Sequence, residues 1–321
     1  MIDTTITQDM LEGFTTEKRN ESSMDIDTKS SIDILRIIND EDKTVPFAVE
    51  KALGPIASLV DDVVAAFRKG GRLVYIGAGT SGRLGVLDAS ECPPTFGVSR
   101  DMVQGLIAGG SEALMRSIEG AEDDPESGVA ELESIGFGAG DVLVGITASG
   151  QAPYVLGAMA KARDLGAVVA AISCNHGSKT FKYAKHAIFL DVGPEIVTGS
   201  TRMKAGTAQK LVLNMITTAS MIRLGKVFHN LMVDLRPVNR KLVERSKRLI
   251  RQATGCSRDE AEAAFEASGR RPKIAIIMVL LKVDKAEAER LEAAGGGPIA
   301  RAIRVFGEER DEKQRSGRSH G

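Results

Sequence analysis

The sequence predicts an α/β protein in which helices sandwich a parallel sheet, followed by a small all-helical module. Two patterns lead to this prediction. Five short, continuously apolar segments alternate with helical patterns, as is typical of parallel strands covered by helices on both faces. Beyond Asp234 only helical patterns occur, and Ser257 with Glu260 forms a capping box. The predicted strands are Leu73–Ile76, Met102–Ala108, Val142–Ile146, Ala167–Ile172 and Ala187–Leu190.

Helical periodicity, with apolar residues at spacings of three and four, fills the segments around these strands. Before the sheet it predicts helices over Ile32–Ile38 and Val45–Phe67. The helix after the first strand is expected to end at Pro93 and Pro94, because proline has no N–H to donate. The predicted helices from the first strand onward are Ser81–Ser90, Ser111–Glu119, Ser127–Ile135, Ala152–Leu165 and Thr201–Leu224.

These patterns divide the 321 residues into four parts. We expect residues 1–44 to form an N-terminal arm with the first helix, and residues 45–235 to form the sheet domain. Residues 236–306 are predicted to form the helical module. Residues 307–321 are strongly polar, and we expect them to be a disordered tail.

The composition narrows the class of protein and of partner. A net charge of −1 gives no argument for nucleic acid or a membrane surface, and with no Trp and 4% aromatic residues a base-stacking platform is not expected. The three cysteines are odd in number and far apart, which argues against a disulfide framework. The start of the chain lacks the pattern of a secretory signal, and apolar runs such as Ala275–Leu281 are too short to cross a bilayer. We therefore expect a cytoplasmic protein.

The segment Gly77–Gly82 fits G-x-G-x-x-G between a strand and a helix. A dinucleotide site would also need an acidic residue after the next strand, but that strand runs into Gly109-Gly110-Ser111. A tight turn that binds nothing is another interpretation. Because Thr80 and Ser81 add hydroxyls to the free N–H groups of a helix start, we favour an anion site.

A second loop has the same character. Thr147-Ala148-Ser149-Gly150-Gln151 again follows a strand and precedes a helix. One such loop is explained by helix capping, since Ser and Thr are favoured N-caps. Two of them, both at the carboxyl edge of the sheet, favour a pocket for a phosphate monoester. We predict that Thr147, Ser149 and Gln151 contribute to it, together with Thr80 and Ser81.

A third candidate is the segment Gly199–Lys204, where the long helix starts. Ser200 and Thr201 offer hydroxyls, and the nearby cations could complete an anion site. A helix cap with solvated cations explains the same residues equally well. The sequence leaves this choice open.

Metal ligands and further catalytic groups are not evident. The histidines do not fall at metal-ligand spacing with the cysteines, and Cys92 has no neighbouring His, so no metal or cofactor is expected. Glu91 lies in Ser90-Glu91-Cys92-Pro93-Pro94 and Glu122 in an acidic loop. From their surroundings in the sequence, neither stands out from a solvated surface charge.

Several long motifs, in one order, resemble the N-acetylmuramic acid 6-phosphate etherases. The resemblance covers nearly the whole chain up to its last dozen residues. The central region is also similar to a sugar isomerase (SIS) domain related to the glucokinase regulatory protein, and the C-terminal module resembles a ubiquitin-associated fold. The motifs are Thr16–Asn20, Ile38–Asp42, Gly77–Gly97, Glu119–Asp123, Gly193–Glu195, Gly199–Thr207 and Leu231–Asp234.

The resemblance implies a cofactor-independent cleavage of the D-lactyl ether of N-acetylmuramate 6-phosphate. The products would be N-acetylglucosamine 6-phosphate and D-lactate, in recycling of cell-wall sugars. It implies Glu91 as the proton donor to departing lactate and Glu122 as the second acid–base residue. It also implies a homodimer.

The chemistry of such a reaction requires two carboxylates in different protonation states. One removes the C2 proton of the open-chain aldehyde, and the other protonates the lactate that leaves from C3. A helix from Ser81 to Glu91 separates these residues by about 15 Å at about 1.5 Å per residue. Glu91 therefore either serves a phosphate held mainly by the Thr147–Gln151 loop or reaches the pocket of a neighbouring subunit.

Two other functions compete with the etherase. A non-catalytic sugar-phosphate sensor with a SIS domain would need the phosphate loops but no acid–base pair. An NAD-dependent oxidoreductase rests on the glycine motif alone. The pair Glu91 and Glu122 distinguishes the etherase from both.

Overall fold

The computed structural model describes residues 7–235, 237 and 240–318, and these form two compact units. The sheet unit extends to Glu91 and resumes over Ser99–Thr218. The helical unit comprises Cys92–Val98 and the chain from Ala219 onward. The division falls inside two helices, Gly79–Phe96 and Lys204–Arg223, whereas the sequence placed the border at 235–236.

The centre of the sheet unit is a parallel sheet with the strand order β2-β1-β3-β4-β5. All five predicted strands are confirmed, with ends shifted by at most one residue. All are short, and the three inner strands β1, β3 and β4 are buried almost throughout because helices cover both faces of the sheet. The strands are β1 Leu73–Gly77, β2 Val103–Ile107, β3 Val142–Ile146, β4 Val168–Ser173 and β5 His186–Phe189.

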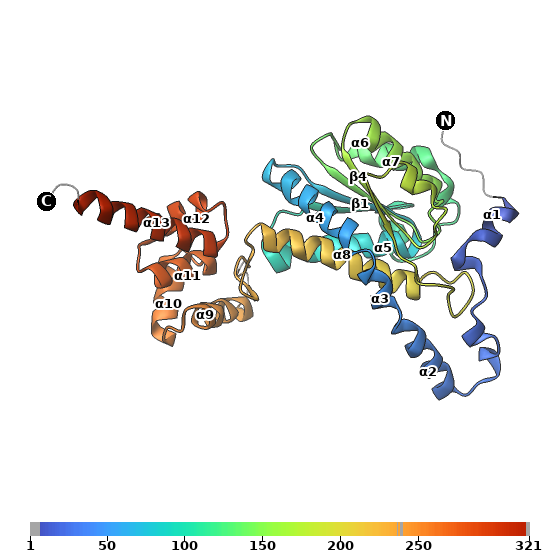
Figure 1. Ribbon diagram of the computed structural model, residues 1–321, viewed down its shortest axis with the longest axis horizontal. Helices are drawn as coiled ribbons and strands as arrows, with labels where there is room; N and C mark the ends of the chain where they lie inside the picture. Colours follow the sequence, from blue (N-terminus) through green and yellow to red (C-terminus); the bar gives the residue numbers. More distant parts are fainter. Residues whose placement is uncertain (1–6, 236, 238–239, 319–321) are drawn as a thin grey trace. The chain divides into compact units, whose positions relative to one another are not determined.

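Helices α6 and α7 cover one face of the sheet, and α4, α5 and α8 cover the other (Figure 1). On the first face Val74, Leu143 and Tyr154 belong to one buried apolar cluster. On the second face Tyr75 meets α5, where a Cβ added to Gly85 would lie 2.9 Å from the Tyr75 Cβ. The bounds are α4 Leu53–Arg68, α5 Gly79–Phe96, α6 Pro125–Ser134, α7 Pro153–Asp164 and α8 Lys204–Arg223.

Helix α5 does not end at its two prolines, and that prediction is wrong. It continues to Phe96, and the Gly97 N–H donates to the Pro93 carbonyl at 2.9 Å. Both prolines lie in the last turn of the helix. Each lacks an N–H, so the helix loses only two backbone hydrogen bonds there, and the fixed φ of proline is compatible with a helix. The actual stop is Gly97, whose φ of +68° is the left-handed conformation of a helix C-terminus.

The predicted helix over Ser111–Glu119 is also largely absent. A 3₁₀ turn, η4, occupies Gly110–Leu114, and Gly109 and Gly110 enter it with φ of +84° and +67°. Turns follow it up to the short 3₁₀ helix η5, Ala121–Asp123. The three-to-four spacing of apolar residues here reflects contacts of a compact loop rather than a continuous helix.

From residue 7 on, the N-terminal arm consists of short helical turns followed by the longer helix α2. It lies against the sheet unit, where the Ser23 hydroxyl donates to the Ile196 carbonyl at 2.7 Å and the Asn20 amide to the Pro194 carbonyl at 3.1 Å. The pattern over Val45–Phe67 forms two helices, α3 and α4. The arm contains α1 Gln8–Gly13, η1 Thr15–Glu17, η2 Glu21–Ser23, η3 Ile26–Thr28 and α2 Ser31–Asp42, and α3 Val45–Glu50 follows it.

The helical unit packs five helices around a core that includes Ile250, Phe265 and Leu291. Its capping box forms, since the Glu260 N–H donates to the Ser257 hydroxyl and the Ser257 N–H to the Glu260 carboxylate. A small hairpin of β6 Val227–Phe228 and β7 Leu231–Met232 precedes it, which the sequence did not predict. The helices are α9 Arg240–Thr254, α10 Arg258–Ala267, α11 Pro272–Leu281, α12 Lys285–Ala294 and α13 Ile299–Arg318.

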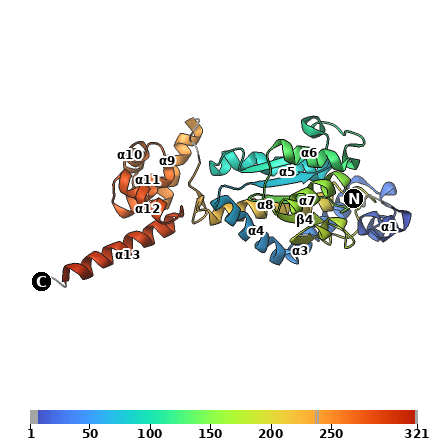
Figure 2. The same ribbon diagram turned by 90° about the horizontal axis from the view of Figure 1, so that it is seen from above.

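The tail expected to be disordered from residue 307 is instead helical as far as Arg318. Helix α13 extends beyond the other helices of its unit (Figure 2). Glu309 forms an ion pair with Arg290 of α12, with Nη2 and Oε2 2.6 Å apart. A segment rich in Glu, Lys, Arg and Gln suits a helix, because these residues lose little rotamer freedom there. Residues 319–321 lie outside the described residues.

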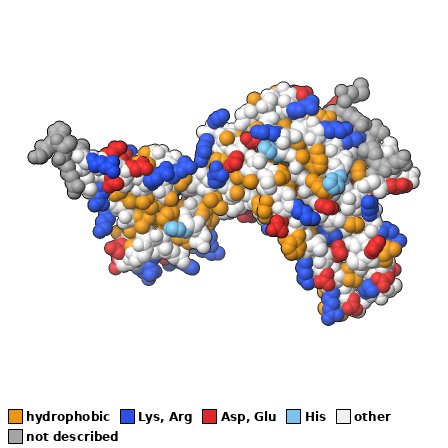
Figure 3. All heavy atoms as spheres, in the orientation of Figure 1, with side chains coloured by type: hydrophobic (Ala, Val, Ile, Leu, Met, Phe, Trp, Pro, Cys, Tyr) orange, Lys and Arg blue, Asp and Glu red, His pale blue; other side chains and the backbone are white. Residues whose placement is uncertain are grey.

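The surface carries both signs of charge. Lys and Arg side chains alternate with Asp and Glu over the face drawn in Figure 3, in keeping with a net charge of −1. No helix within the described residues combines the length and apolar composition needed to cross a membrane.

Candidate active site

The order of the strands places the two predicted loops side by side. The chain moves from β1 outward to β2 and then returns to β3 on the other side of β1, so β1 and β3 flank a switch point. Gly77, the last residue of β1, pairs in register with Ile146, the last residue of β3. The loops that begin at Ala78 and Thr147 therefore leave the same edge of the sheet as neighbours.

The first loop is held close to the strand that precedes it. A Cβ added to Gly82 would lie 2.6 Å from the Gly77 carbonyl oxygen, so only glycine allows this approach. Thr80 is half-buried and faces the start of α8, where a Cβ added to Gly206 would lie 3.4 Å from its methyl group. Ser81 is buried, and its hydroxyl donates to Oε1 of Gln209 at 2.9 Å.

The second loop is shaped by its own hydroxyls. The Gly150 N–H donates to the Thr147 hydroxyl and the Gln151 N–H to the Ser149 hydroxyl, each at 3.2 Å. Gly150 has a φ of +76°, and an added Cβ would lie 2.1 Å from the Ser178 hydroxyl. The two hydroxyl oxygens therefore accept backbone N–H groups, as in a helix cap. They also lie 3.2 Å apart and share one hydrogen bond, so one of their two protons remains to be donated.

Gln151 lies deeper in this loop than its neighbours. Its Nε2 donates to the Gly177 carbonyl at 3.2 Å, and it is 1% exposed. Its Oε1 has no hydrogen-bond partner among the described residues. An unpaired buried acceptor costs about 1–3 kcal/mol, which makes it a candidate for a bond to a ligand donor.

Asn175 and Thr16 are parts of this edge that sequence reasoning missed. The Asn175 Nδ2 donates to the Thr16 hydroxyl at 3.0 Å and to the Ala148 carbonyl at 3.2 Å, and both side chains are buried. The arm therefore lies directly against the Thr147–Gln151 loop. Thr16 opens one of the motifs that carry the family resemblance, but nothing local to Asn175 distinguished it.

The third candidate segment does not leave an open helix N-terminus. The carboxylate of Glu195 accepts the N–H groups of Lys204 and Ala205, each at 2.9 Å. Burial raises the pKa of Glu195, although these bonds and the Lys204 charge oppose the rise. Lys204 is not a solvated cation, because it is 2% exposed and its Nζ lies 2.6 Å from Glu41 Oε2. Ser200 and Thr201 lie half-buried just before this capped start.

Glu122 lies on the loop that follows β2, at the same edge of the sheet. Its turn η5 contacts α7, the helix that the Thr147–Gln151 loop opens. The side chain reaches solvent but is surrounded by enough protein that desolvation raises its pKa, and the charge of Asp123 raises it further. A carboxyl group of this kind can hold a proton closer to neutral pH than an ordinary Glu.

Glu91 lies away from this edge. Helix α5 runs back along β1, with Gly82 against Gly77 and then Gly85 against Tyr75. Glu91 is exposed, and it lies ten residues beyond Ser81, about 15 Å along the axis at about 1.5 Å per residue. The structure thus brings the two hydroxyl loops and Glu122 to one edge within a chain, and leaves Glu91 apart from them.

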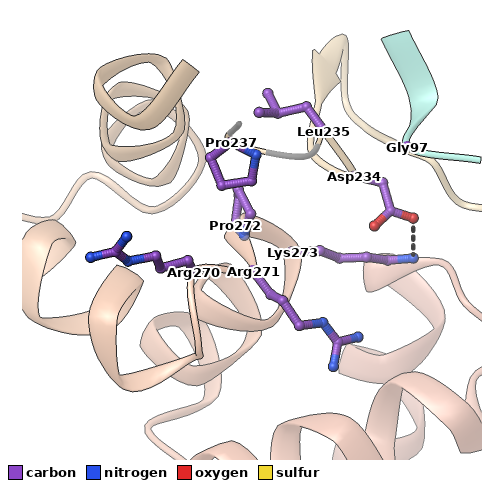
Figure 4. Close-up of a pocket in the computed structure, with 8 residues that line it drawn as sticks. All are labelled: Gly97, Asp234, Leu235, Pro237, Arg270, Arg271, Pro272 and Lys273. Atoms are coloured by element: carbon purple, nitrogen blue, oxygen red, sulfur yellow. Dashed lines mark ion pairs between the residues drawn. The ribbon is translucent and has the colours of Figure 1, made fainter. Parts of the chain in front are cut away.

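A separate pocket of about 300 Å³ lies in the helical unit (Figure 4). Lys273 points toward Asp234 there, with Nζ and Oδ2 3.7 Å apart, and its Nζ is 2.9 Å from Glu292 Oε1. Arg271 pairs with Glu292 and with Glu289. These cations are balanced by carboxylates, and the pocket contains none of the predicted site residues. Over residues 7–235, 237 and 240–318, no group of three or more His, Cys, Asp or Glu is placed to hold a metal ion.

Comparison with known proteins first defines the class. Residues 55–163 match the glucokinase regulatory protein N-terminal SIS domain. Similar solved structures include a phosphoheptose isomerase from Neisseria gonorrhoeae (19% identity, 60% of this chain and 98% of that chain, TM-score 0.47). Another is a phosphoheptose isomerase from Francisella tularensis (18% identity, 60% and 100%, TM-score 0.48). The family match places a SIS-type domain in the sheet unit, and a helical region follows it.

Curated relatives then define the family. N-acetylmuramic acid 6-phosphate etherases from Mesorhizobium japonicum and Glaesserella parasuis are 56% and 57% identical to this chain, each over 89% of this chain and 94% of the relative. The one from Photobacterium profundum is 57% identical over 90% and 96%. The chain belongs to this family and is an enzyme, as the resemblance of its motifs predicted.

Proposed function

We propose that this enzyme cleaves the D-lactyl ether of N-acetylmuramate 6-phosphate, with water, to N-acetylglucosamine 6-phosphate and D-lactate. The observation that carries the proposal is the pairing of the two hydroxyl loops at the β1–β3 switch point, with a carboxyl group of raised pKa on the next loop of the same edge. The first feature suits a phosphate monoester, and the second suits proton transfer. Membership in the etherase family supports the same substrate.

The phosphate is assigned to hydroxyl and N–H donors rather than to cations. Thr80 and Ser81 on one loop, and Thr147, Ser149 and Gln151 on the other, supply donors at two helix starts. Anions bind such helix starts because the N–H groups and the helix dipole point toward them. Ser200 and Thr201 complete the proposed set from the segment before α8.

The proposed chemistry is an elimination followed by a hydration. A carboxylate removes the C2 proton of the open-chain aldehyde, the C3–O bond breaks, and its electron pair leaves with lactate, which Glu91 protonates. Water then adds at C3, and a proton returns to C2. Glu122 is the second acid–base residue, and its raised pKa makes it a better proton acceptor than an ordinary Glu.

We further propose that the working enzyme is a homodimer in which Glu91 serves the partner's pocket. The exposed position of Glu91, about 15 Å along α5 from Ser81, supports this arrangement. So does the segment formed by α2 and α3, since α2 has no buried side chain, and Ile32, Leu35 and Phe47 are all more than half exposed. Exposed apolar residues gathered on one segment are typical of a surface that another chain covers.

The direct test is incubation of the purified protein with N-acetylmuramate 6-phosphate, with D-lactate measured after the reaction is stopped. Release that needs no added nicotinamide, and that is lost in Glu122→Ala, is the expected result. A folded protein that binds the sugar phosphate but releases no lactate would instead be a sensor, and a change in nicotinamide absorbance would indicate an oxidoreductase. We place the enzyme in the cytoplasm, in recycling of cell-wall sugars.

A further inference from the structure

Ser81 has one polar side-chain partner among the described residues, and it is the amide of Gln209. Gln209 lies in the second turn of α8, far from Ser81 in the sequence, and both side chains are buried. The Ser81 hydroxyl donates its proton to the Gln209 Oε1 at 2.9 Å. In this state the Ser81 oxygen presents lone pairs, and its only proton is engaged inside the protein.

This arrangement conflicts with phosphate binding, because a phosphate dianion offers only acceptors. Ser81 can bond to it only by donating its proton. The proton is released if the Gln209 amide presents Nε2 rather than Oε1 to Ser81. Each orientation of the Gln209 amide makes one hydrogen bond to the Ser81 side chain. Turning the amide therefore leaves the number of hydrogen bonds between the two side chains unchanged.

The Gln209 amide is free to make this exchange. Its Nε2 is buried and has no hydrogen-bond partner among the described residues, so turning the amide breaks no other bond to that atom. Gln151, by contrast, is anchored, since its Nε2 donates to the Gly177 carbonyl. The turn exchanges an unpaired Nε2 for an unpaired Oε1, so the two orientations are similar in hydrogen bonding and a bound phosphate can decide between them.

We propose that Gln209 is a positioning residue for the substrate phosphate. Its amide accepts the Ser81 proton in the empty enzyme, and turns on binding so that Nε2 donates to Ser81 and the Ser81 proton passes to a phosphate oxygen. The inference rests on the proposed function only in taking Ser81 as a phosphate ligand. It adds a residue on α8 that never touches the phosphate itself.

A double-mutant cycle tests the coupling, with the dissociation constant of the product N-acetylglucosamine 6-phosphate measured by titration calorimetry. We expect Ser81→Ala to weaken binding about 10-fold and Gln209→Met about 5-fold. The double variant should bind within about twofold of Ser81→Ala alone, because Gln209 acts only through Ser81. Binding weakened about 50-fold, the product of the single effects, would overturn the proposal, as would an unchanged affinity in Ser81→Ala.

A second variant tests the turning of the amide and does not depend on Gln209→Met folding. Gln209→Glu has the same shape, but its carboxylate only accepts, so it retains the Ser81 proton. We expect weaker binding than in Gln209→Met. Thr207→Glu, at an exposed position of the same helix, measures the effect of the added charge alone. Equal affinities for Gln209→Glu and Thr207→Glu would refute the turn.

These measurements separate the inference from the proposed function. The probe is the reaction product, so binding is read without turnover, while lactate release by the unmutated enzyme tests the reaction. Enzyme assays add a further readout, since a positioning residue for the phosphate should raise KM and leave kcat within about twofold. Thermal melting of each variant shows that it is folded.

Discussion

The two ends of helix α5 differ in almost every respect that matters for catalysis. At its start, Ser81 is buried, bonded to Gln209 and placed beside the Thr147–Gln151 loop. Toward its other end, Glu91 is exposed and about 15 Å away along the axis. One chain thus organises the proposed phosphate end of the site and Glu122, but not Glu91. The difference teaches that the pocket of a single chain is incomplete if Glu91 takes part.

The largest effect is expected at Glu122, on the sheet edge that carries the two hydroxyl loops. Glu122→Gln keeps the shape of the side chain but cannot take up a proton, so kcat should fall about 10²–10⁴-fold while the product still binds normally. Stopped lactate assays and calorimetric titration measure the two quantities. Glu126→Gln, an exposed neighbour on α6, is the matched control and should retain full activity. A kcat reduced less than tenfold in Glu122→Gln would exclude an acid–base role.

The second prediction tests whether Glu91 and Glu122 of one chain act in different active sites. Glu91→Gln and Glu122→Gln chains should each be inactive alone. If the site is shared, mixing equal amounts and allowing exchange should restore about a quarter of the activity, since half of the dimers are mixed and each has one intact site. Size-exclusion chromatography with light scattering must show the dimer. No recovery from a verified mixture of dimers would mean that Glu91 and Glu122 act within one chain.

A smaller effect is expected from the second hydroxyl loop. Ser149→Ala removes one donor to the phosphate, so KM should rise about tenfold with kcat within about twofold. Ser134→Ala removes an exposed hydroxyl from α6 and serves as the control. Steady-state lactate release gives both constants. A fall in kcat with KM unchanged would move Ser149 from substrate binding to the chemical step.

The smallest expected effect concerns stability. Because the pKa of Glu122 is raised in the folded enzyme, folding favours its protonated form, and the associated stability is lost as pH rises through the folded pKa. Glu122→Gln should therefore raise Tm above neutral pH, by about 1–3 °C since the side chain is partly exposed. Below the ordinary Glu pKa of about 4.3 the difference should vanish. Melting curves at pH 4 and pH 8 test this, and a larger gain at pH 4 would contradict it.

The elements with a local cause were predictable. Short apolar strands between helical patterns marked all five strands, and the hydroxyl-rich loops were evident from their position after strands. Other local rules failed. Pro93 and Pro94 do not stop α5, because both fall in its last turn, and the apolar spacing after Gly110 belongs to a 3₁₀ turn and a loop.

The features with a distant cause were not predictable. Asn175 hydrogen-bonds to Thr16, which is remote from it in the sequence. Gln209 on α8 hydrogen-bonds to Ser81 on α5. The start of α8 looked open to an anion, but Glu195 caps it and Glu41 neutralises Lys204. No periodicity or spacing encodes such pairs, because they depend on how separate elements pack.

By itself, then, the sequence determined the parallel sheet, the order of the helices and the two hydroxyl loops. These follow from apolar periodicity and from the turn chemistry of residues close together in the chain. Only the tertiary structure decided that these loops meet at one edge, that the start of α8 is closed, and that Glu91 lies far from Ser81. Each of these depends on strand order and helix direction, which bring together, or hold apart, groups that are remote in the sequence.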